Sequence, residues 1–493
     1  MTGIRMIGMT VVAALGAATT AYGQWTFLLD QGFRTQIQYQ EVNSLILLPD
    51  GNLIASGVMR FPGEMSDKRL VRLLTNGARD PAFYNSGLGG GRLTLWNNHY
   101  YVGTSQVRRI LPNGHLDPSF ISMGQGFYFS IHQGGDYHVY PDGRILMSGK
   151  HLLSDSIRGF EGYYNLIWFS NEGYLDTTLV HRQGNGVVNR FAELPNGQFI
   201  CSGTCTEFEG KAVDWIFRVH ADGTPDTTFR TGVYIGEART YLPLPDGRVY
   251  VGGNFRRTEA PQDTLRLVRF MPDGSLDPSF TIPQFLTGDG ISDPFGAYVF
   301  GLYQFRPDRI IVVGQFRSVN GEPRKSICMI DTTGQVLPAF DDCGVGTFTQ
   351  FLTGSSILEV LPTPNADTLY ICGVYTGYND GQVNDPLQRF VSRLLVQEIT
   401  TEVAERDEPP LALQLYPNPA RGLVVVSYAL EQAVGSTELV MRDPAGREVA
   451  RLPLGATEGR AEWGIQGLPA GVYTVELRQA GHVQQVSRLV VQP

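Results

Sequence analysis

Apolar and polar positions alternate along most of the chain in short runs, and each run is bounded by a turn that contains glycine. The clearest pattern is a Pro-Asp-Gly or Pro-Asn-Gly turn followed by an alternating strand that ends in glycine, at 48–57, 140–149, 194–203 and 244–253. Degenerate copies span 95–103, 306–314 and 363–373. Proline and glycine supply the dihedral angles of tight turns, and a period of two is typical of a half-buried strand. The pattern predicts seven strands that leave a turn in the same way.

A second pattern alternates with the first and consists of an apolar strand, a turn and a Leu-Asp-Pro-Ser-Phe motif or a variant of it. Its copies span 72–83, 109–120, 168–179, 218–229, 269–280 and 329–340. Each repeat is then two hairpins, or four short antiparallel strands. Four strands per unit and seven units predict an all-β fold, a seven-bladed β-propeller.

The last repeat lacks its second half at the C-terminal side, where 389–396 supplies only the first strand of the pattern. The missing part is present near the other end, as FLLDQGF at 27–33. We therefore predict that the propeller closes by strand exchange, with the N-terminal strand paired to 390–396, which leaves no unpaired edge. The glycines that end the first pattern should lie where backbones approach closely; they are Gly57, Gly103, Gly149, Gly203, Gly253, Gly314 and Gly373.

Arginine and aspartate stand at fixed places on either side of the second turn, which makes them cross-strand neighbours. The predicted pairs are Arg72 with Asp80, Arg109 with Asp117, Arg218 with Asp226, Arg269 with Asp277 and, from opposite ends of the chain, Arg393 with Asp30. Met329 and Leu337 replace both members in one repeat, and Trp168 faces Asp176 in another. As surface ion pairs, each would contribute about 0.2 to 1 kcal/mol.

Composition divides the chain into segments. With 493 residues, more than one domain is expected. The propeller is predicted at 24–396, an acidic linker with two prolines at 397–410, and a small Ig-like β-sandwich of about seven short strands at 411–493. Residues 1–23 have the layout of a signal peptide, with cleavage between Gly23 and Gln24. The alternative for 1–23 is an N-terminal membrane anchor. No transmembrane segment is expected in the mature chain.

Charge and cysteine content narrow the classes of function. A net charge of −9 offers no basic face for nucleic acid. Five cysteines are too few for a disulfide scaffold, and we interpret them as small core residues, with a Cys201–Cys205 or Cys328–Cys343 bridge left open. The cysteines and histidines lack the paired spacing of a zinc site.

The candidate chemistry is sparse. The chain contains no GxSxG, HExxH, P-loop or GxGxxG motif in a suitable context, so no catalytic residue and no cofactor are predicted. Calcium is one interpretation of the cluster Asn379, Asp380, Asn384 and Asp385, and an exposed polar turn is the other.

Two classes of function remain in view. We expect a monomeric, non-enzymatic surface or secreted propeller that binds an extracellular glycan or protein. The alternative is an extracellular hydrolase or lyase with its site at the central channel. Its candidate residues include Asp136, His138 and His151, and the other interpretation of each is a solvated loop residue.

Two resemblances sharpen these expectations. The repeats at about 25–396 resemble the delta-60 repeat of large exported bacterial proteins, which implies a propeller-like binding scaffold without catalytic residues. The motifs LYPNP (415–419), DPAGREV (443–449), LPAGVYTVEL (468–477) and SRLVV (487–491) resemble the type A C-terminal sorting domain of the type IX secretion system of Bacteroidota. The matching positions are Pro417, Asn418, Pro419, Gly446, Gly471 and Tyr473.

The second resemblance implies Sec-dependent export, outer-membrane translocation and contact with the type IX machinery and its sorting protease, followed by release or surface attachment. The chain ends in RLVVQP, and it departs from the family's frequent lysine-containing ending. An ordinary Ig-like adhesive module is the alternative for this tail.

Overall fold

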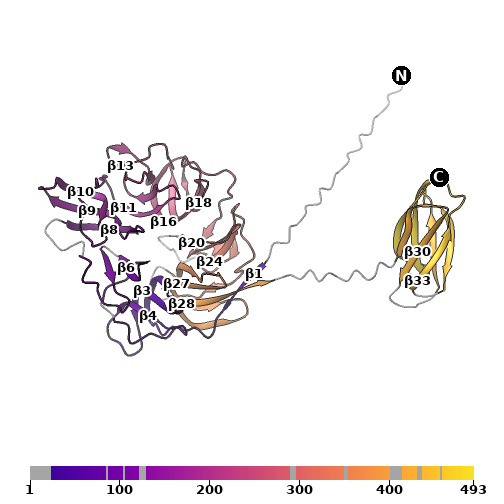
Figure 1. Cartoon of the computed structure of the whole chain (residues 1–493), viewed down its shortest axis with the longest axis horizontal. Helices are drawn as coiled ribbons and strands as arrows, with labels where there is room; N and C mark the ends of the chain where they lie inside the picture. Colours follow the sequence, from indigo (N-terminus) through magenta and orange to yellow (C-terminus); the bar gives the residue numbers. More distant parts are fainter. Residues whose placement is uncertain are drawn as a thin grey trace, which may run out of the picture. The chain divides into compact units, whose positions relative to one another are not determined.

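The computed structural model describes residues 24–84, 87–103, 106–121, 129–288, 296–348, 354–399, 413–429, 436–455 and 458–492. The chain divides into two compact units, Met1–Ile399 and Thr400–Pro493. The described residues form strands and turns and contain no helix, which confirms the all-β prediction (Figure 1). None of them therefore belongs to a helix that could span a membrane. The predicted signal peptide with Gly23, and residues 400–410 of the predicted linker, lie outside the described residues.

The first unit is a succession of antiparallel sheets whose strands follow one another along the chain (Figure 1). Each of the seven turn-and-strand copies forms the middle strand of its own sheet. In chain order the sheets are β2 (Tyr39–Leu47), β3 (Leu53–Arg60) and β4 (Lys68–Leu73); β5 (Arg92–Trp96), β6 (His99–Gly103) and β7 (Val107–Ile110); β8 (Phe129–Val139), β9 (Ile145–Asp155) and β10 (Phe160–Phe169); β11 (Val188–Glu193), β12 (Phe199–Gly203) and β15 (Ile216–Val219); β16 (Val233–Pro243), β17 (Val249–Arg257) and β18 (Ala260–Phe270); β20 (Tyr298–Arg306), β21 (Arg309–Gln315) and β24 (Ile327–Asp331); and β26 (Ser356–Pro362), β27 (Thr368–Asn379) and β28 (Asn384–Ile399).

Short strands extend the loops between these elements. They are β13 (Glu207–Phe208) paired with β14 (Lys211–Ala212), β22 (Ser318–Val319) paired with both β19 (Phe285–Leu286) and β23 (Glu322–Pro323), and β25 (Gly344–Val345) paired with β27.

The fourth strand of each predicted unit is shorter than expected. In six sheets it is reduced to a single bridge, such as Ile110 with Leu116 or Phe270 with Leu276. The segment begins directly at the turn and in most copies soon reaches a proline, such as Pro118 or Pro278, which has no N–H to continue a ladder. The prediction of four full strands per unit is therefore wrong for these six sheets.

Neighbouring sheets are held together by shared hydrophobic cores. Buried side chains of one sheet pack against those of the next all along the unit. The last sheet packs against the first in the same way, because Tyr370 and Val391 share a core with Val42 and Leu45. The sheets therefore form a closed ring, and this circular packing replaces a single central core.

The ring is closed by the N-terminal strand, as the sequence predicts. β1 (Gln24–Leu29) pairs antiparallel with β28, with Phe27 opposite Val396 and Leu29 opposite Leu394 (Figure 1). The pairing continues to Gln24 opposite Ile399. Residues 397–399 are predicted as linker from the sequence. In the structure they belong to a strand, because they pair with Thr26, Trp25 and Gln24 of β1.

The second unit is a small β-sandwich. Its strands are β29 (Leu413–Arg421), β30 (Leu423–Ala429), β31 (Thr437–Arg442), β32 (Glu448–Leu454), β33 (Glu458–Gly464), β34 (Gly471–Gln479) and β35 (His482–Val491). They are hydrogen-bonded in the order β32-β31-β34-β35-β29-β30-β33, and β29 joins the two layers. Val424, Leu439, Val475 and Leu489 lie in the core between the layers.

Candidate functional site

The structure brings every predicted arginine and aspartate pair together. The shortest N···O distances are 2.5 Å for Arg72–Asp80, 2.6 Å for Arg109–Asp117, 2.8 Å for Arg218–Asp226, 2.7 Å for Arg269–Asp277 and 2.8 Å for Arg393–Asp30. The phenylalanine three residues after each aspartate lies against the guanidinium, at 5.3 Å for Phe280 with Arg269 and 5.0 Å for Phe33 with Arg393. Arginine, aspartate and phenylalanine thus form one recurring cluster.

These pairs are more buried than the surface pairs assumed from the sequence. The side chains of Arg269 and Asp277 are each only 4% exposed, because phenylalanine covers them. Arg269 also donates to the carbonyl of Thr332, and Arg393 donates to the carbonyl of Thr75, in the next sheet around the ring. The clusters of Arg269 and Arg393 therefore each link two sheets, and the estimate for an exposed pair is too low for them.

In four of these clusters hydrogen bonds hold the aspartate ionised and lower its pKa; the residues are Asp80, Asp117, Asp226 and Asp277. Burial raises the pKa of Asp226, but hydrogen bonds from Thr228 and Arg218 outweigh it and lower that pKa to about 2. The two repeats without arginine keep only the main-chain part of the cluster, where Leu337 donates to the carbonyl of Met329 and Asp176 to that of Trp168. The clusters are structural and leave no free acid for chemistry.

The proposed calcium cluster is part of the closure. Asp385 forms an ion pair with Arg34, and Asp380 accepts a hydrogen bond of 2.7 Å from the amide of Leu29. Asn379 and Asn384 pair with each other at the end of the β27–β28 hairpin. Within the described residues, no three side chains from histidine, cysteine, aspartate and glutamate gather as metal ligands. The two carboxylates thus fasten the N-terminal segment to the last sheet.

The three candidates for catalysis do not converge. His151 is buried and its Nε2 lies 2.9 Å from the carbonyl of Ser148. His138 contacts Glu193 at 3.4 Å, and burial lowers its pKa. Asp136 alone among them lines the cavity that the first strands of the sheets enclose.

That cavity, called here the central channel, has a volume of about 750 Å³. Its wall contains residues from the first strand of every sheet, namely β2, β5, β8, β11, β16, β20 and β26. Its charged side chains are Glu41, Arg92, Asp136, Arg190, Arg239 and Glu359. Only one of these six residues was singled out from the sequence.

Several residues of the channel wall are bulge residues of the first strands, and the bulge turns their side chains into the channel. In β16 the register skips Arg239, because Ala238 pairs with Gly253 and Thr240 with Gly252. Four other first strands also contain a residue that has no partner on the middle strand; these residues are Asn43, Asn189, Phe300 and Leu358. In each case the preceding residue pairs with a closing glycine. A bulge bends the strand and re-aims a side chain. The sequence signal that could have found these residues is their nearly constant spacing before the closing glycine.

The closing glycines make this backbone path possible. A Cβ on Gly253 would lie 2.1 Å from the carbonyl oxygen of Glu237, and one on Gly314 would lie 2.0 Å from that of Tyr298. No side chain fits at such a distance. In six of the seven sheets the predicted close approach therefore lies between the middle strand and the bulged first strand, whereas a Cβ on Gly103 would meet the ring of Tyr137 in the next sheet at 2.6 Å.

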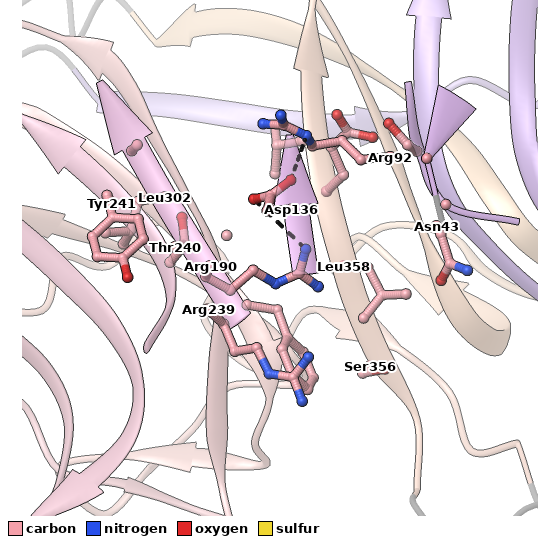
Figure 2. Close-up of a pocket in the computed structure, with 18 of the residues that line it drawn as sticks. Asn43, Arg92, Asp136, Arg190, Arg239, Thr240, Tyr241, Leu302, Ser356 and Leu358 are labelled. Atoms are coloured by element: carbon pink, nitrogen blue, oxygen red, sulfur yellow. Dashed lines mark ion pairs between the residues drawn. The ribbon is translucent and has the colours of Figure 1, made fainter. Parts of the chain in front are cut away.

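An ion-pair network occupies one side of the channel. Figure 2 shows Asp136 between Arg92 and Arg190. Arg92 Nε lies 3.2 Å from Asp136 Oδ1, and Arg190 Nη1 lies 3.8 Å from Asp136 Oδ2. Asp136 is therefore engaged mainly by Arg92, and Arg190 is only partly neutralised.

Glu359 is a different kind of carboxyl in the same channel. Burial raises its pKa to about 7, although hydrogen bonds from Leu45 and Ser44 and the charge of Arg92 act in the opposite direction. The amide of Leu45 lies 2.8 Å from Glu359 Oε2. At neutral pH this carboxyl is thus close to half protonated.

The motif residues of the tail connect strands of the sandwich to one another. Asn418 donates to the carbonyl of Arg488 at 2.6 Å and accepts from the amide of Val490 at 2.9 Å, so it links β29 to the last strand. Pro417 and Pro419 flank it. Tyr473 is buried and donates to Pro469, and Gly471 pairs with Val491.

The last motif glycine, Gly446, takes a positive φ of 81° in the β31–β32 turn. Elsewhere in the chain, all five cysteines are free and neither possible bridge is formed.

Two sequence families match parts of the chain. Residues 48–83 and 244–280 match a family described as a domain of unknown function (DUF5122) β-propeller. Residues 414–492 match the secretion system C-terminal sorting domain. None of the curated proteins compared with the chain matches it.

Solved structures give distant similarities. The chain is 12% identical to PorZ, an essential bacterial surface component of the type IX secretion system of Porphyromonas gingivalis, over 95% of this chain and 68% of that chain, with a TM-score of 0.34. It is also 12% identical to a putative exported protein from Bacteroides fragilis, over 62% of this chain and 90% of that chain, with a TM-score of 0.28.

Proposed function

We propose that this exported β-propeller protein, which a type IX sorting domain directs to the medium or to the outer-membrane surface, is a seven-bladed binding protein that takes an extracellular glycan into its central channel. The observation that carries the proposal is the cavity of about 750 Å³, whose wall comes from the first strand of every sheet. Arginines, carboxylates and aromatic side chains all contribute to that wall.

The size and the rigidity of the channel favour a small ligand. Ligand pockets usually have volumes of about 300 to 1,000 Å³. A cavity of this size suits a few sugar units and is too small for a folded protein domain. Because the wall belongs to hydrogen-bonded strands of a closed ring, little order has to be gained on binding.

A glycan array and a protein pull-down with the full chain test the proposal. Leu358→Trp would fill part of the channel, because Leu358 lies on its wall. Leu387→Trp is the matched control, since Leu387 is 55% exposed on β28. We expect glycan binding that falls at least tenfold in Leu358→Trp and stays unchanged in Leu387→Trp. Equal binding by both variants, or capture of proteins alone, would contradict a glycan site in the channel.

A second candidate, an extracellular hydrolase or lyase, is favoured by Glu359. Glu359, with a pKa of about 7, faces the same cavity as a second carboxyl, Asp136, and glycoside-cleaving enzymes use two carboxyl groups as their acid and their base. Incubating each bound glycan with the protein, and with Glu359→Gln as a control, distinguishes the two functions. Cleavage products that disappear in the variant would establish the enzyme, and an unchanged glycan supports binding alone.

A further inference from the structure

Two arginine side chains face the same part of the central channel with donors left over. Arg190 and Arg239 extend from neighbouring first strands, β11 and β16, and Figure 2 shows their guanidinium groups side by side. Each side chain keeps 34% of its surface exposed. Both residues line the channel, so an entering ligand can reach them.

The described protein groups do not satisfy these two guanidinium groups. Among the described residues Arg190 forms one ion pair, with Asp136 at 3.8 Å, and that carboxylate lies closer to Arg92. Arg239 contacts Glu237 at 2.9 Å through Nη2, whereas its Nε is buried without a hydrogen-bond partner among the described residues. A buried donor without a partner is costly, and two neighbouring positive charges repel each other. An oxyanion between them would offset this repulsion and accept hydrogen bonds from the donors that remain exposed on the two arginines.

The surface beside the arginines is apolar and aromatic. Phe300, the bulged residue of β20, lies against the guanidinium of Arg239 at 6.0 Å and stacks on Tyr298 at 5.5 Å. Leu358 faces the same space from β26. An anionic group next to an apolar ring face matches a charged sugar, whose pyranose C–H groups can pack on phenylalanine while its carboxylate reaches the arginines.

We infer that Arg190 and Arg239 bind the carboxylate of an acidic saccharide, with Phe300 beneath the sugar. This inference rests on the proposed function and gives its ligand a chemical class. The arginines act as binding residues.

Isothermal titration of the full chain with glucuronate tests this inference, with glucose as the uncharged counterpart and acetate as the bare carboxylate. The variants are Arg190→Gln, Arg239→Gln and the milder Arg239→Lys, which keeps the charge but loses the planar fork. Arg144→Gln is the control, because Arg144 pairs with Asp142 in an exposed turn. Thermal unfolding of each variant checks that it is folded.

We expect glucuronate to bind at least tenfold more tightly than glucose or acetate. Arg190→Gln and Arg239→Gln should each weaken it at least tenfold, with a smaller loss in Arg239→Lys and none in Arg144→Gln. The inference is wrong if glucose or acetate binds as well as glucuronate, or if the arginine variants bind it normally. Binding of neutral glycans that Leu358→Trp abolishes and the arginine variants leave intact would preserve the proposed function and overturn only this assignment.

Discussion

At the scale of single residues, the spacing of arginine and aspartate in the repeats predicts correctly which side chains meet. It does not predict how deeply they are buried, because that depends on a phenylalanine whose place over the guanidinium is set by the packing of two sheets. The channel residues Arg190, Arg239 and Glu359 were missed for a related reason. Arg190 and Glu359 belong to no repeated motif, and the place of Arg239 can be read only from its spacing before the closing glycine Gly253.

Reversing the charge of the closing arginine should destabilise the ring. Arg393 contacts Asp30 at 2.8 Å and the carbonyl of Thr75 at 2.7 Å, so Arg393→Glu places two like charges together and removes the donor to both acceptors. We expect a loss of about 2 to 4 kcal/mol, seen as a lower melting temperature. The exchange of both residues, Arg393→Asp with Asp30→Arg, should recover part of the loss. Arg144→Glu, in an exposed turn, should change stability by less than about 0.5 kcal/mol. An unchanged melting temperature in Arg393→Glu would refute the pairing.

The raised pKa of Glu359 predicts a pH dependence. In the folded protein this pKa is about 7, above the ordinary 4.5, so the folded state holds the proton more tightly than the unfolded state between those values. Stability from this group is therefore complete below about pH 4.5 and falls as the pH rises to 7. One pKa unit corresponds to about 1.4 kcal/mol, so the change is on the order of 1 to 3 kcal/mol. The difference in free energy of unfolding between wild type and Glu359→Gln should shift by this amount between pH 5 and pH 8. Parallel profiles would contradict a buried, neutral carboxyl.

At the scale of strands and turns, hairpins follow directly from the sequence. Proline, aspartate or asparagine, and glycine specify the turns, and alternation specifies the strands. The bulges do not follow, since their side chains belong to no common type: Asn43, Arg239, Phe300 and Leu358 occupy equivalent places. What they share is a glycine on the neighbouring strand. The backbone geometry of the bulges, and not the type of side chain, therefore determines which residues form the binding surface of the channel.

Adding one methyl group at a closing glycine tests this relation. In Gly253→Ala the new Cβ would meet the carbonyl of Glu237 at 2.1 Å, so the bulge that carries Arg239 has to shift. We expect a destabilisation of about 1 to 3 kcal/mol in chemical unfolding. Gly464→Ala is the control, because no neighbouring atom lies within 4 Å of its added Cβ. Equal stability of the two variants would count against the close approach.

At the scale of the whole molecule, the division of the chain into two separately folded units was predictable from composition and motifs. The packed core of the sandwich contains only its own residues, and the first unit is closed by its own N-terminal strand. The extent of the last strand was not predictable, because residues 397–399 look like linker until their partners on β1 are known.

Removal of the C-terminal unit should prevent export to the surface without changing the fold of the propeller. We expect a chain without 411–493 to keep the melting transition of its propeller and to accumulate in the periplasm, because the sorting domain carries the export information. Cell fractionation and surface labelling measure the outcome. Asn418→Ala, which loses two hydrogen bonds to β35, should give an intermediate yield at the surface. Full surface display of the shortened chain would refute the sorting role.

The pairing of β1 with β28 also fixes an order of events in time. Trp25 meets Glu398 across almost the whole length of the first unit, and contacts of such long sequence separation form late and slowly. β1 therefore cannot complete the ring until β28 has formed. Until that moment the nascent propeller has two open edges that can pair with other chains. We expect the cell to keep this intermediate bound to chaperones, and its rate of folding to depend on the concentration of free β1 peptide added in trans.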